Sequence, residues 1–380
     1  MHQPVNLLES SGAMIFHATD QPFLSVIVSV YNKQDSLSRC LDSLLDCPVA
    51  LEIIIVDDDS SDDSRSIAQA YVDQYQNCKL ICLTKNCGAG EARNVGAKHA
   101  RGQYLAFFDA DDWCENAVLS TLYDQLAEHS FPDIAVTGYK KYCHHDYQSN
   151  YTFHTRYLGL HTGVQAVELR LAKVICPSPW NKLYKTSYWQ NHKLAWPEMR
   201  HSEDFASILE FLAEAESVLI SNQAYYCYNV NEGSLTRSLK ADKIDHMLTA
   251  LEHMRVRSSS IKHADLIDNF DNKLNRVCYA HLRYFLNINA ASISRDALIY
   301  LCSRLIQFNL DHAVPYRFFV KEFDGYKFLK LLRQVQTQHK LAYNILEHYS
   351  TLEQLKINTF VLSPIKLRVW KKRSPTRYPN

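Results

Sequence analysis

The chain has 380 residues, of which 47% are hydrophobic and 22% are charged, and this is the composition of an ordinary globular protein. Its 41 lysines and arginines balance its 41 aspartates and glutamates, so the formal net charge at pH 7 is zero. The balance argues against a general nucleic-acid-binding protein, which is usually basic, and no nucleic-acid partner is expected.

Signals for targeting and covalent cross-linking are few. Residues 1–22 lack a basic start followed by an apolar core, so we expect an N-terminal extension and no signal peptide. No run of 18 apolar residues occurs, so no membrane-spanning helix is expected. The 11 cysteines are scattered without a C-x-x-C pair, which favours free thiols in a reducing compartment over disulfides or a zinc site. These features predict a cytoplasmic protein.

From Leu24 onward, strand and helix patterns alternate four times. The predicted strands are continuously apolar, as expected for buried parallel strands, and they cover 24–32, 51–60, 79–85 and 102–112. Apolar residues at helical spacing follow the first three strands, within 33–47, 62–75 and 88–101. The alternation predicts an α/β fold with a mostly parallel sheet that is flanked by helices.

The pattern is less regular after residue 130. Strands are predicted at 133–143, 151–160 and 223–230, and a helix at 202–218 with Ser202 as its N-cap. Long helical patterns dominate beyond residue 240. We therefore expect a main domain over 23–240, a helical C-terminal domain over 241–355 and a basic tail over 356–380.

Polar side chains follow the predicted strands at one edge of the sheet, where ligands bind in such folds. The fourth strand ends in Asp109, Asp111 and Asp112. In an extended D-x-D segment both carboxylates point to the same side, which suits Mg²⁺ or Mn²⁺ shared with a substrate's phosphates. A bound cation would also offset the repulsion between these acids. The plainer alternative is solvated loop acids, with Asp112 capping a helix.

A second acidic cluster ends the second strand. One carboxylate within 57–59 could accept a hydrogen bond from a pyrimidine N–H. Solvated turn acids are the alternative for Asp57. A phosphatase of the haloacid dehalogenase type also places D-x-D after a strand, but that class has Thr or Val where this chain has Trp113, and here three strand–helix units precede the motif.

Four segments together resemble glycosyltransferase family 2, whose fold is GT-A. They are "VIVSVYN", "IIIVDDDSSDDS", "NCGAGEARNVGAKHARGQYLAFFDADDW" and "HSEDFASILEF", in the family's order and spacing. The resemblance covers residues 24 to about 236. It implies a nucleotide-sugar donor, a Mn²⁺ or Mg²⁺ cofactor and transfer with inversion of the anomeric configuration.

The resemblance also assigns roles to individual residues. Asp204 is the implied general base, with Glu203 beside it. Asp111 is the implied metal contact, with Asp109 and Asp112 near it. The implied nucleotide-binding residues are Ser29, Tyr31, Asn32, Asp58, Asp59, Arg93, Asn94 and Asp109. Ser29 replaces the family's usual Pro, and Asp59 replaces its usual Gly. These two departures leave the identity of the nucleotide undetermined.

The acceptor side is expected in "PSPWNKLYKTSYW", where Trp180 and Asn181 are candidates for contact with a sugar; the alternative for Trp180 is a core position. The Q-x-x-R-W signature of processive relatives is absent after the E-D pair, which favours transfer of a single sugar. The basic, aromatic tail could dock on an anionic membrane surface, or be a solvated terminus.

The resemblance implies transfer from a UDP-sugar to a glycan or lipid-linked acceptor in bacterial surface polysaccharide synthesis. Two alternatives stay open: a nucleotidyltransferase, although "SVYNKQDSL" lacks a Gly- and Arg/Lys-rich phosphate loop, and a glycan-binding protein that kept the GT-A fold and lost turnover. The sequence leaves the oligomeric state undetermined.

Overall fold

The computed structural model describes residues 21–45, 47–143, 149–230 and 241–258, together with most of 267–280. Two compact units are distinguished: Met1–Arg237 with His246–Val277, and Ser238–Asp245 with Cys278–Asn380. The two sheets and the site described below belong to the first unit. The predicted helical domain beyond residue 280 and the basic tail lie outside the described residues.

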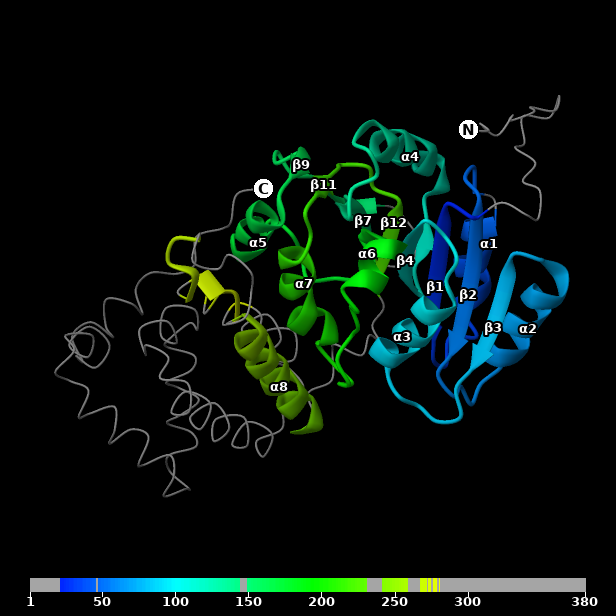
Figure 1. Ribbon diagram of the computed structural model, residues 1–380. Helices are drawn as coiled ribbons and strands as arrows, with labels where there is room; N and C mark the ends of the chain where they lie inside the picture. The colour runs from blue at the N-terminus through cyan, green and yellow to red at the C-terminus, as the bar shows by residue number, and fades with distance from the viewer. Residues whose placement is uncertain are drawn as a thin grey trace, which may run out of the picture. The chain divides into compact units, whose positions relative to one another are not determined.

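The first half of the chain forms the alternating pattern that the sequence predicts. Strands β1 (Leu24–Val30), β2 (Leu51–Asp57), β3 (Cys78–Cys82) and β4 (Tyr104–Asp109) alternate with helices α1 (Leu37–Leu45), α2 (Ser64–Gln74) and α3 (Ala89–His99). The order in the sheet is β3-β2-β1-β4, and all three neighbouring pairs are parallel (Figure 1). Each of these predicted strands and helices is confirmed, with shifted ends.

Helices cover both faces of this sheet. Val26 and Val28 of β1 belong to one apolar cluster with Leu41 of α1 and Ala68 of α2. Ile27 points to the opposite face, where α3 packs so closely that a Cβ on Gly96 would lie 2.3 Å from Ile27 Cγ2. Because both faces are covered, β1 and β2 are buried almost throughout, which explains their unbroken apolar sequence.

Four short strands extend the sheet to eight, in the order β3-β2-β1-β4-β10-β6-β11-β9. They are β6 (Ile134–Val136), β9 (Gly159–His161), β10 (Lys182–Lys185) and β11 (Val218–Ile220). Of the sheet's seven pairings, three are antiparallel: β10 with β4, β10 with β6, and β11 with β9. The prediction of a mostly parallel sheet is confirmed.

A second sheet has the order β5-β12-β7-β8, from β5 (Trp113–Cys114), β7 (Tyr139–Cys143), β8 (Ser149–Phe153) and β12 (Tyr226–Val230). The strands predicted at 133–143 and 151–160 are each divided between the two sheets. The first breaks at Thr137, whose N–H donates to the carbonyl of Asn181 at 2.9 Å. A hydrophobic pattern cannot show such a crossing, because each half satisfies the same alternation.

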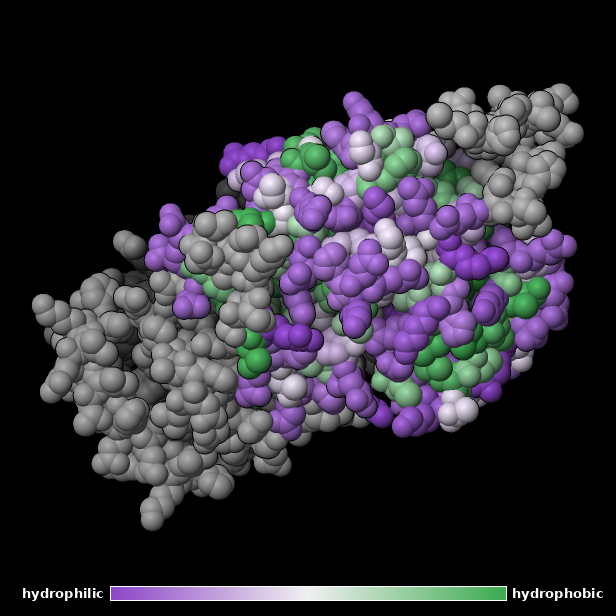
Figure 2. Space-filling view, viewed as in Figure 1, coloured by the Kyte–Doolittle hydropathy of each residue, from purple (hydrophilic) through white to green (hydrophobic). Residues whose placement is uncertain are grey.

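The remaining helices are η1 (Asn116–Val118), α4 (Leu119–Glu128), α5 (Gly163–Leu171), α6 (Thr186–Asn191), α7 (Glu203–Ala213) and α8 (Ala241–Ser258). Helix α7 is shorter than predicted, since Val218 already belongs to β11. Ser202 occupies its N-cap position in a left-handed conformation, and its side chain makes no capping hydrogen bond. In the view of Figure 2 the described surface is mainly hydrophilic, with an apolar area over the part that contains β3.

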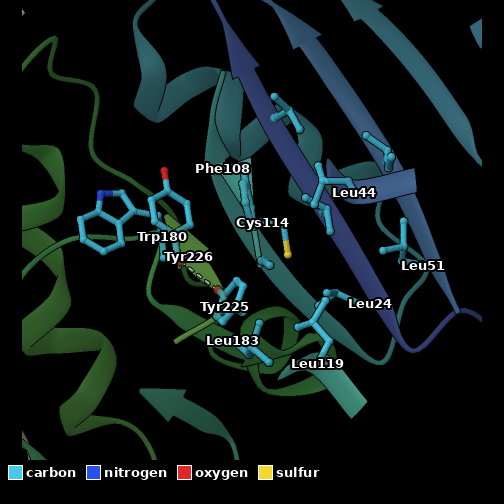
Figure 3. Close-up of a cluster of buried hydrophobic side chains, with 14 of the residues drawn as sticks. Leu24, Leu44, Leu51, Phe108, Cys114, Leu119, Trp180, Leu183, Tyr225 and Tyr226 are labelled. Carbon is cyan, nitrogen blue, oxygen red and sulfur yellow. Dashed lines mark hydrogen bonds between the residues drawn. The ribbon is translucent and has the colours of Figure 1, made fainter. Parts of the chain in front are cut away.

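The core joins the two sheets. Figure 3 shows Phe108 of β4 beside Tyr225, Tyr226 and Trp180. The Trp180 ring stacks on Tyr226 with centroids 4.5 Å apart, and the hydroxyl of Tyr225 donates to the carbonyl of Trp180 at 2.8 Å. These aromatic contacts lie directly beneath the carboxyl end of β4.

Candidate active site

The carboxyl ends of β1, β2 and β4 meet at one edge of the sheet. In the parallel register Ser29 is opposite Val56 on one side and Asp109 on the other, and Val30 is opposite Asp57. The acids that follow β2 and β4 are therefore brought to the same edge by backbone pairing.

Asp58 is buried, and its carboxylate fixes the loop that leads into α3. One oxygen accepts from the N–H of Cys87 at 2.7 Å and the other from the N–H of Gly88 at 2.8 Å. Burial raises the pKa of Asp58, and the two backbone hydrogen bonds oppose that shift. A Cβ at Gly88 would lie 3.6 Å from Arg200 Cα, so this loop also adjoins the segment before α7.

Two predicted nucleotide-binding residues have left-handed backbones. Asn32 has φ 50°, and its side-chain oxygen accepts from the N–H of Ser61 at 2.8 Å. Asp59 has φ 63° at the position where the family usually has Gly. A left-handed conformation favours Gly and tolerates Asn or Asp, which explains the usual residue and the substitute. Tyr31 is 44% exposed, so its ring is accessible to a planar base.

Asp109 and Glu203 share one guanidinium. Arg93 of α3 places Nη2 2.8 Å from Asp109 Oδ1 and Nη1 2.6 Å from Glu203 Oε1. Burial alone lowers the pKa of Arg93, but the two carboxylates outweigh it and raise that pKa above its ordinary value. One buried cation thus joins the end of β4 to the start of α7.

Asp111 and Asp112 differ in their surroundings. Lys33 Nζ lies 2.6 Å from Asp111 Oδ2, and both side chains are partly exposed. Asp112 is 1% exposed; its carboxylate accepts from the hydroxyl of Tyr226 and from the N–H of Asn229. Burial, then the charges of Asp111 and Asp109, raise the pKa of Asp112 well above its usual range.

Asp204 has neither a cation nor a side-chain hydrogen-bond donor on its carboxylate among the described residues. It is partly buried, its Oδ1 accepts from the N–H of Phe205 at 2.7 Å, and among the described residues it forms no salt bridge. Burial and the neighbouring Glu203 charge raise the pKa of Asp204 to about 7. A carboxylate in this state can take up a proton near neutral pH, as a general base must.

Asn94 and the two predicted acceptor residues are held by the protein itself. Asn94 exchanges two hydrogen bonds with the backbone of Trp196, at 2.9 and 2.8 Å, and thereby fixes the segment before α7. Asn181 is buried and donates to the carbonyl of Thr137 at 2.9 Å. Trp180 is 8% exposed and lies in the aromatic core rather than on an open surface.

The acids at the end of β4 fit a divalent cation that is shared with phosphates. No cluster of three or more His, Cys, Asp or Glu side chains suited to a metal occurs in the described part of the chain. Mg²⁺ sites often use one or two carboxylates and complete their coordination with water and substrate phosphates. Asp111 already binds a stand-in cation, the ammonium of Lys33.

Comparison with known proteins shows what the chain is similar to. Residues 25–189, a little under half of the chain, match the family described as "Glycosyl transferase family 2". The chain is 30% identical over 224 residues to Glycosyltransferase GlyA of Streptococcus pneumoniae, and 31% identical over 224 residues to Uncharacterized glycosyltransferase EpsJ of Bacillus subtilis.

These matches cover 56% and 57% of this chain, and the chain spans 31% of the length of GlyA and 63% of that of EpsJ. Among solved structures, S. aureus TarS 1-349 in complex with UDP-GlcNAc has a TM-score of 0.60 and 22% identity, over 78% of this chain and 82% of that one. The likeness shows that the chain has the predicted GT-A fold.

Three residues that contact the carboxylates of Asp111 and Asp112 were not among the predicted site residues. Lys33 immediately follows the Tyr31–Asn32 pair, so its place after β1 was a usable signal. Tyr226 and Asn229 come from β12, more than a hundred positions after Asp112, and no local pattern connects them to it.

Proposed function

We propose that the chain is an inverting, metal-dependent glycosyltransferase that moves a sugar from a nucleotide-diphosphate donor to a glycan or lipid-linked acceptor. The observation that carries the proposal is the meeting of two motifs at Arg93. Asp109, the last residue of β4, and Glu203, the first residue of α7, bind the same guanidinium, which brings Asp204 next to the proposed donor edge of the sheet.

Asp204 has the properties that the proposed base requires. It is partly exposed, carries no ion pair among the described residues, and has a pKa of about 7. In the proposed step its carboxylate takes the proton of the acceptor hydroxyl as that oxygen attacks the anomeric carbon. The neighbouring acids are engaged by cations or by Tyr226 and Asn229, so a single displacement with one free carboxylate is favoured over a two-carboxylate mechanism.

On the donor side, Asp111 and Asp109 would hold the divalent cation, which would stabilise negative charge on the leaving diphosphate when bound. Asp112 would not bind the cation itself; its hydrogen bond with Tyr226 would hold the segment that carries Asp109 and Asp111 in position. Ser29, Tyr31, Asn32, Asp58 and Asp59 remain the proposed nucleotide pocket. Asp58 and Asn32 shape its walls through the loops at 86–88 and 60–61.

The proposed donor is a UDP-sugar and the proposed pathway is bacterial surface polysaccharide synthesis. Relatives include the Succinoglycan biosynthesis protein ExoO of Rhizobium meliloti, 29% identical over 61% of this chain, and the Poly(ribitol-phosphate) beta-glucosyltransferase of Bacillus spizizenii, 28% identical over 64%. The TarS complex with UDP-GlcNAc makes that donor the first to test.

Acceptor and membrane contacts are less directly supported. Trp180 and Asn181 are buried, so we expect them to shape the acceptor side from beneath rather than to stack on a sugar. No described helix has the length and apolar character needed to cross a bilayer. Docking of the basic tail 356–380 on an anionic membrane stays a prediction, and the tail lies outside the described residues.

The test is a screen of nucleotide sugars with purified protein and Mn²⁺, in which release of the nucleoside diphosphate is measured. We expect turnover with one UDP-sugar, its loss on chelation, and its loss in the Asp204→Asn variant. Turnover that persists in the chelator would refute the metal requirement. Binding of a glycan without turnover of any donor would favour the non-catalytic alternative.

A further inference from the structure

Lys33 is a cation built into the site, and neither the family match nor the predicted site residues assign it a role. Its ammonium lies 2.6 Å from Asp111 Oδ2, across the gap between the ends of β1 and β4. Those strands are parallel neighbours, so the ion pair joins two adjacent strand ends at the donor edge.

The backbone around Lys33 is fixed on both sides. Its N–H donates to the hydroxyl of Ser64 at 2.7 Å, and its carbonyl accepts from the N–H groups of Ser36 and Leu37 at 3.0 and 2.9 Å. The hydroxyl of Ser36 donates to the carbonyl of Ala110 at 2.9 Å, which ties this turn to the segment after β4. The base of the lysine side chain is therefore held in place.

The partner is held equally well. Arg39 donates to the carbonyl of Asp111 at 2.7 Å, and Asn229 donates to the same carbonyl at 3.3 Å. The Lys33 side chain is 32% exposed and that of Asp111 is 20% exposed. An ammonium has three N–H donors, and Asp111 Oδ2 takes one of them, so the partly exposed Lys33 side chain has two further donors to offer a ligand.

We propose that Lys33 is a phosphate-binding residue for the donor's diphosphate, and that it competes with the divalent cation for Asp111. The inference rests on the proposed function and concerns the same site. When a cation binds Asp111, the ammonium is released toward the phosphates; without a metal, Lys33 itself supplies positive charge there. Lys33 therefore weakens binding of the divalent cation and strengthens binding of the diphosphate.

The experiment measures binding rather than turnover. In Lys33→Met, Mn²⁺ should bind the donor-free protein about fivefold more tightly, because a competing cation is gone. In the presence of EDTA, UDP should bind about tenfold more weakly, because a charge-assisted hydrogen bond is lost. Uridine, which has no phosphate, should bind both proteins equally, and Lys33→Arg should keep UDP affinity in EDTA.

Lys79→Met is the matched control, since it removes one exposed lysine from β3 and should change none of these affinities. Unchanged UDP affinity in Lys33→Met, or an equal loss for UDP and uridine, would overturn the phosphate contact. Mn²⁺ affinity that is unchanged or weaker would overturn the competition. If the wild-type protein bound no UDP under any condition, the proposed function would fall together with this inference, whereas UDP binding indifferent to Lys33 would remove the inference alone.

Discussion

Arg93 contacts Glu203, the first residue of α7, at 2.6 Å, although 110 positions separate the two in the sequence. Both side chains are nearly buried, at 5% and 10% exposure. Because a guanidinium binds two carboxylates here, the start of α7 cannot move without disturbing Asp109. This contact sets the position of Asp204 relative to the donor edge.

Removing Arg93 should therefore destabilise the protein strongly. Arg93→Met leaves the buried Glu203 charge unpaired, and we expect unfolding free energy to fall by about 3 kcal/mol or more. Urea denaturation measures it. Adding Glu203→Gln should restore part of the loss, since the uncompensated charge is then gone. If the double variant were as unstable as the sum of the two single variants, the pair would not be coupled.

Asp204→Asn should separate binding from chemistry. We expect UDP affinity in calorimetry to stay within about twofold, with transfer reduced by about 100-fold or more. The folded-state pKa lies above the ordinary value, so charging this group destabilises the fold as pH rises through about 7. Asp204→Asn should therefore be more stable than the wild type at pH 8 and similar near pH 4. Normal turnover would eliminate Asp204 as the base.

The pH profile of transfer should report the same group. A base must be deprotonated, so kcat/KM should rise with pH through an apparent pKa near 7 and level off above it. Glu203→Gln removes the adjacent like charge, so the rise of kcat/KM with pH should occur at lower pH, whatever the effect on the maximal rate. Because the two acids interact, the measured value belongs to the pair. If the apparent pKa of this rise were unchanged in Glu203→Gln, Glu203 would not influence the base.

Asp111 and Asp112 should respond differently to amide substitution. Asp111→Asn removes an accessible carboxylate, so Mn²⁺ binding by the donor-free protein should weaken at least about tenfold. Asp112 is buried under Tyr226 and Asn229, and its raised pKa favours the neutral form, so Asp112→Asn should largely keep Mn²⁺ binding. Equal losses in both variants would show that Asp112 is a direct ligand.

Gly96→Ala tests the close approach of α3 to β1. Alanine normally favours a helix over glycine, yet here its Cβ would meet Ile27 Cγ2 at 2.3 Å. We expect unfolding free energy to fall by about 1–3 kcal/mol from overpacking. Combining it with Ile27→Ala, which removes both γ carbons that the new Cβ would meet, tests the geometry: the double variant should lose less stability than the sum of the two single variants. A stabilising Gly96→Ala change would mean that the helix shifts away without cost.

The sequence alone determined the alternating half of the fold. Buried parallel strands must be apolar on both faces, and an amphipathic helix must repeat its apolar residues at 3.6-residue spacing, so both leave a local pattern. The order of four motifs likewise indicated the family that residues 25–189 match, and the strand ends indicated where the acidic side chains would gather.

The tertiary structure alone decided which acids are accessible and which are held. Asp111 and Asp112 are adjacent and chemically identical, yet one binds Lys33 at the edge while the other is buried against β12. Trp180 likewise proved to be a core residue because Tyr226 and Tyr228 stack on it. Burial and pairing depend on segments that are distant in the chain, and local sequence carries no record of those distant partners.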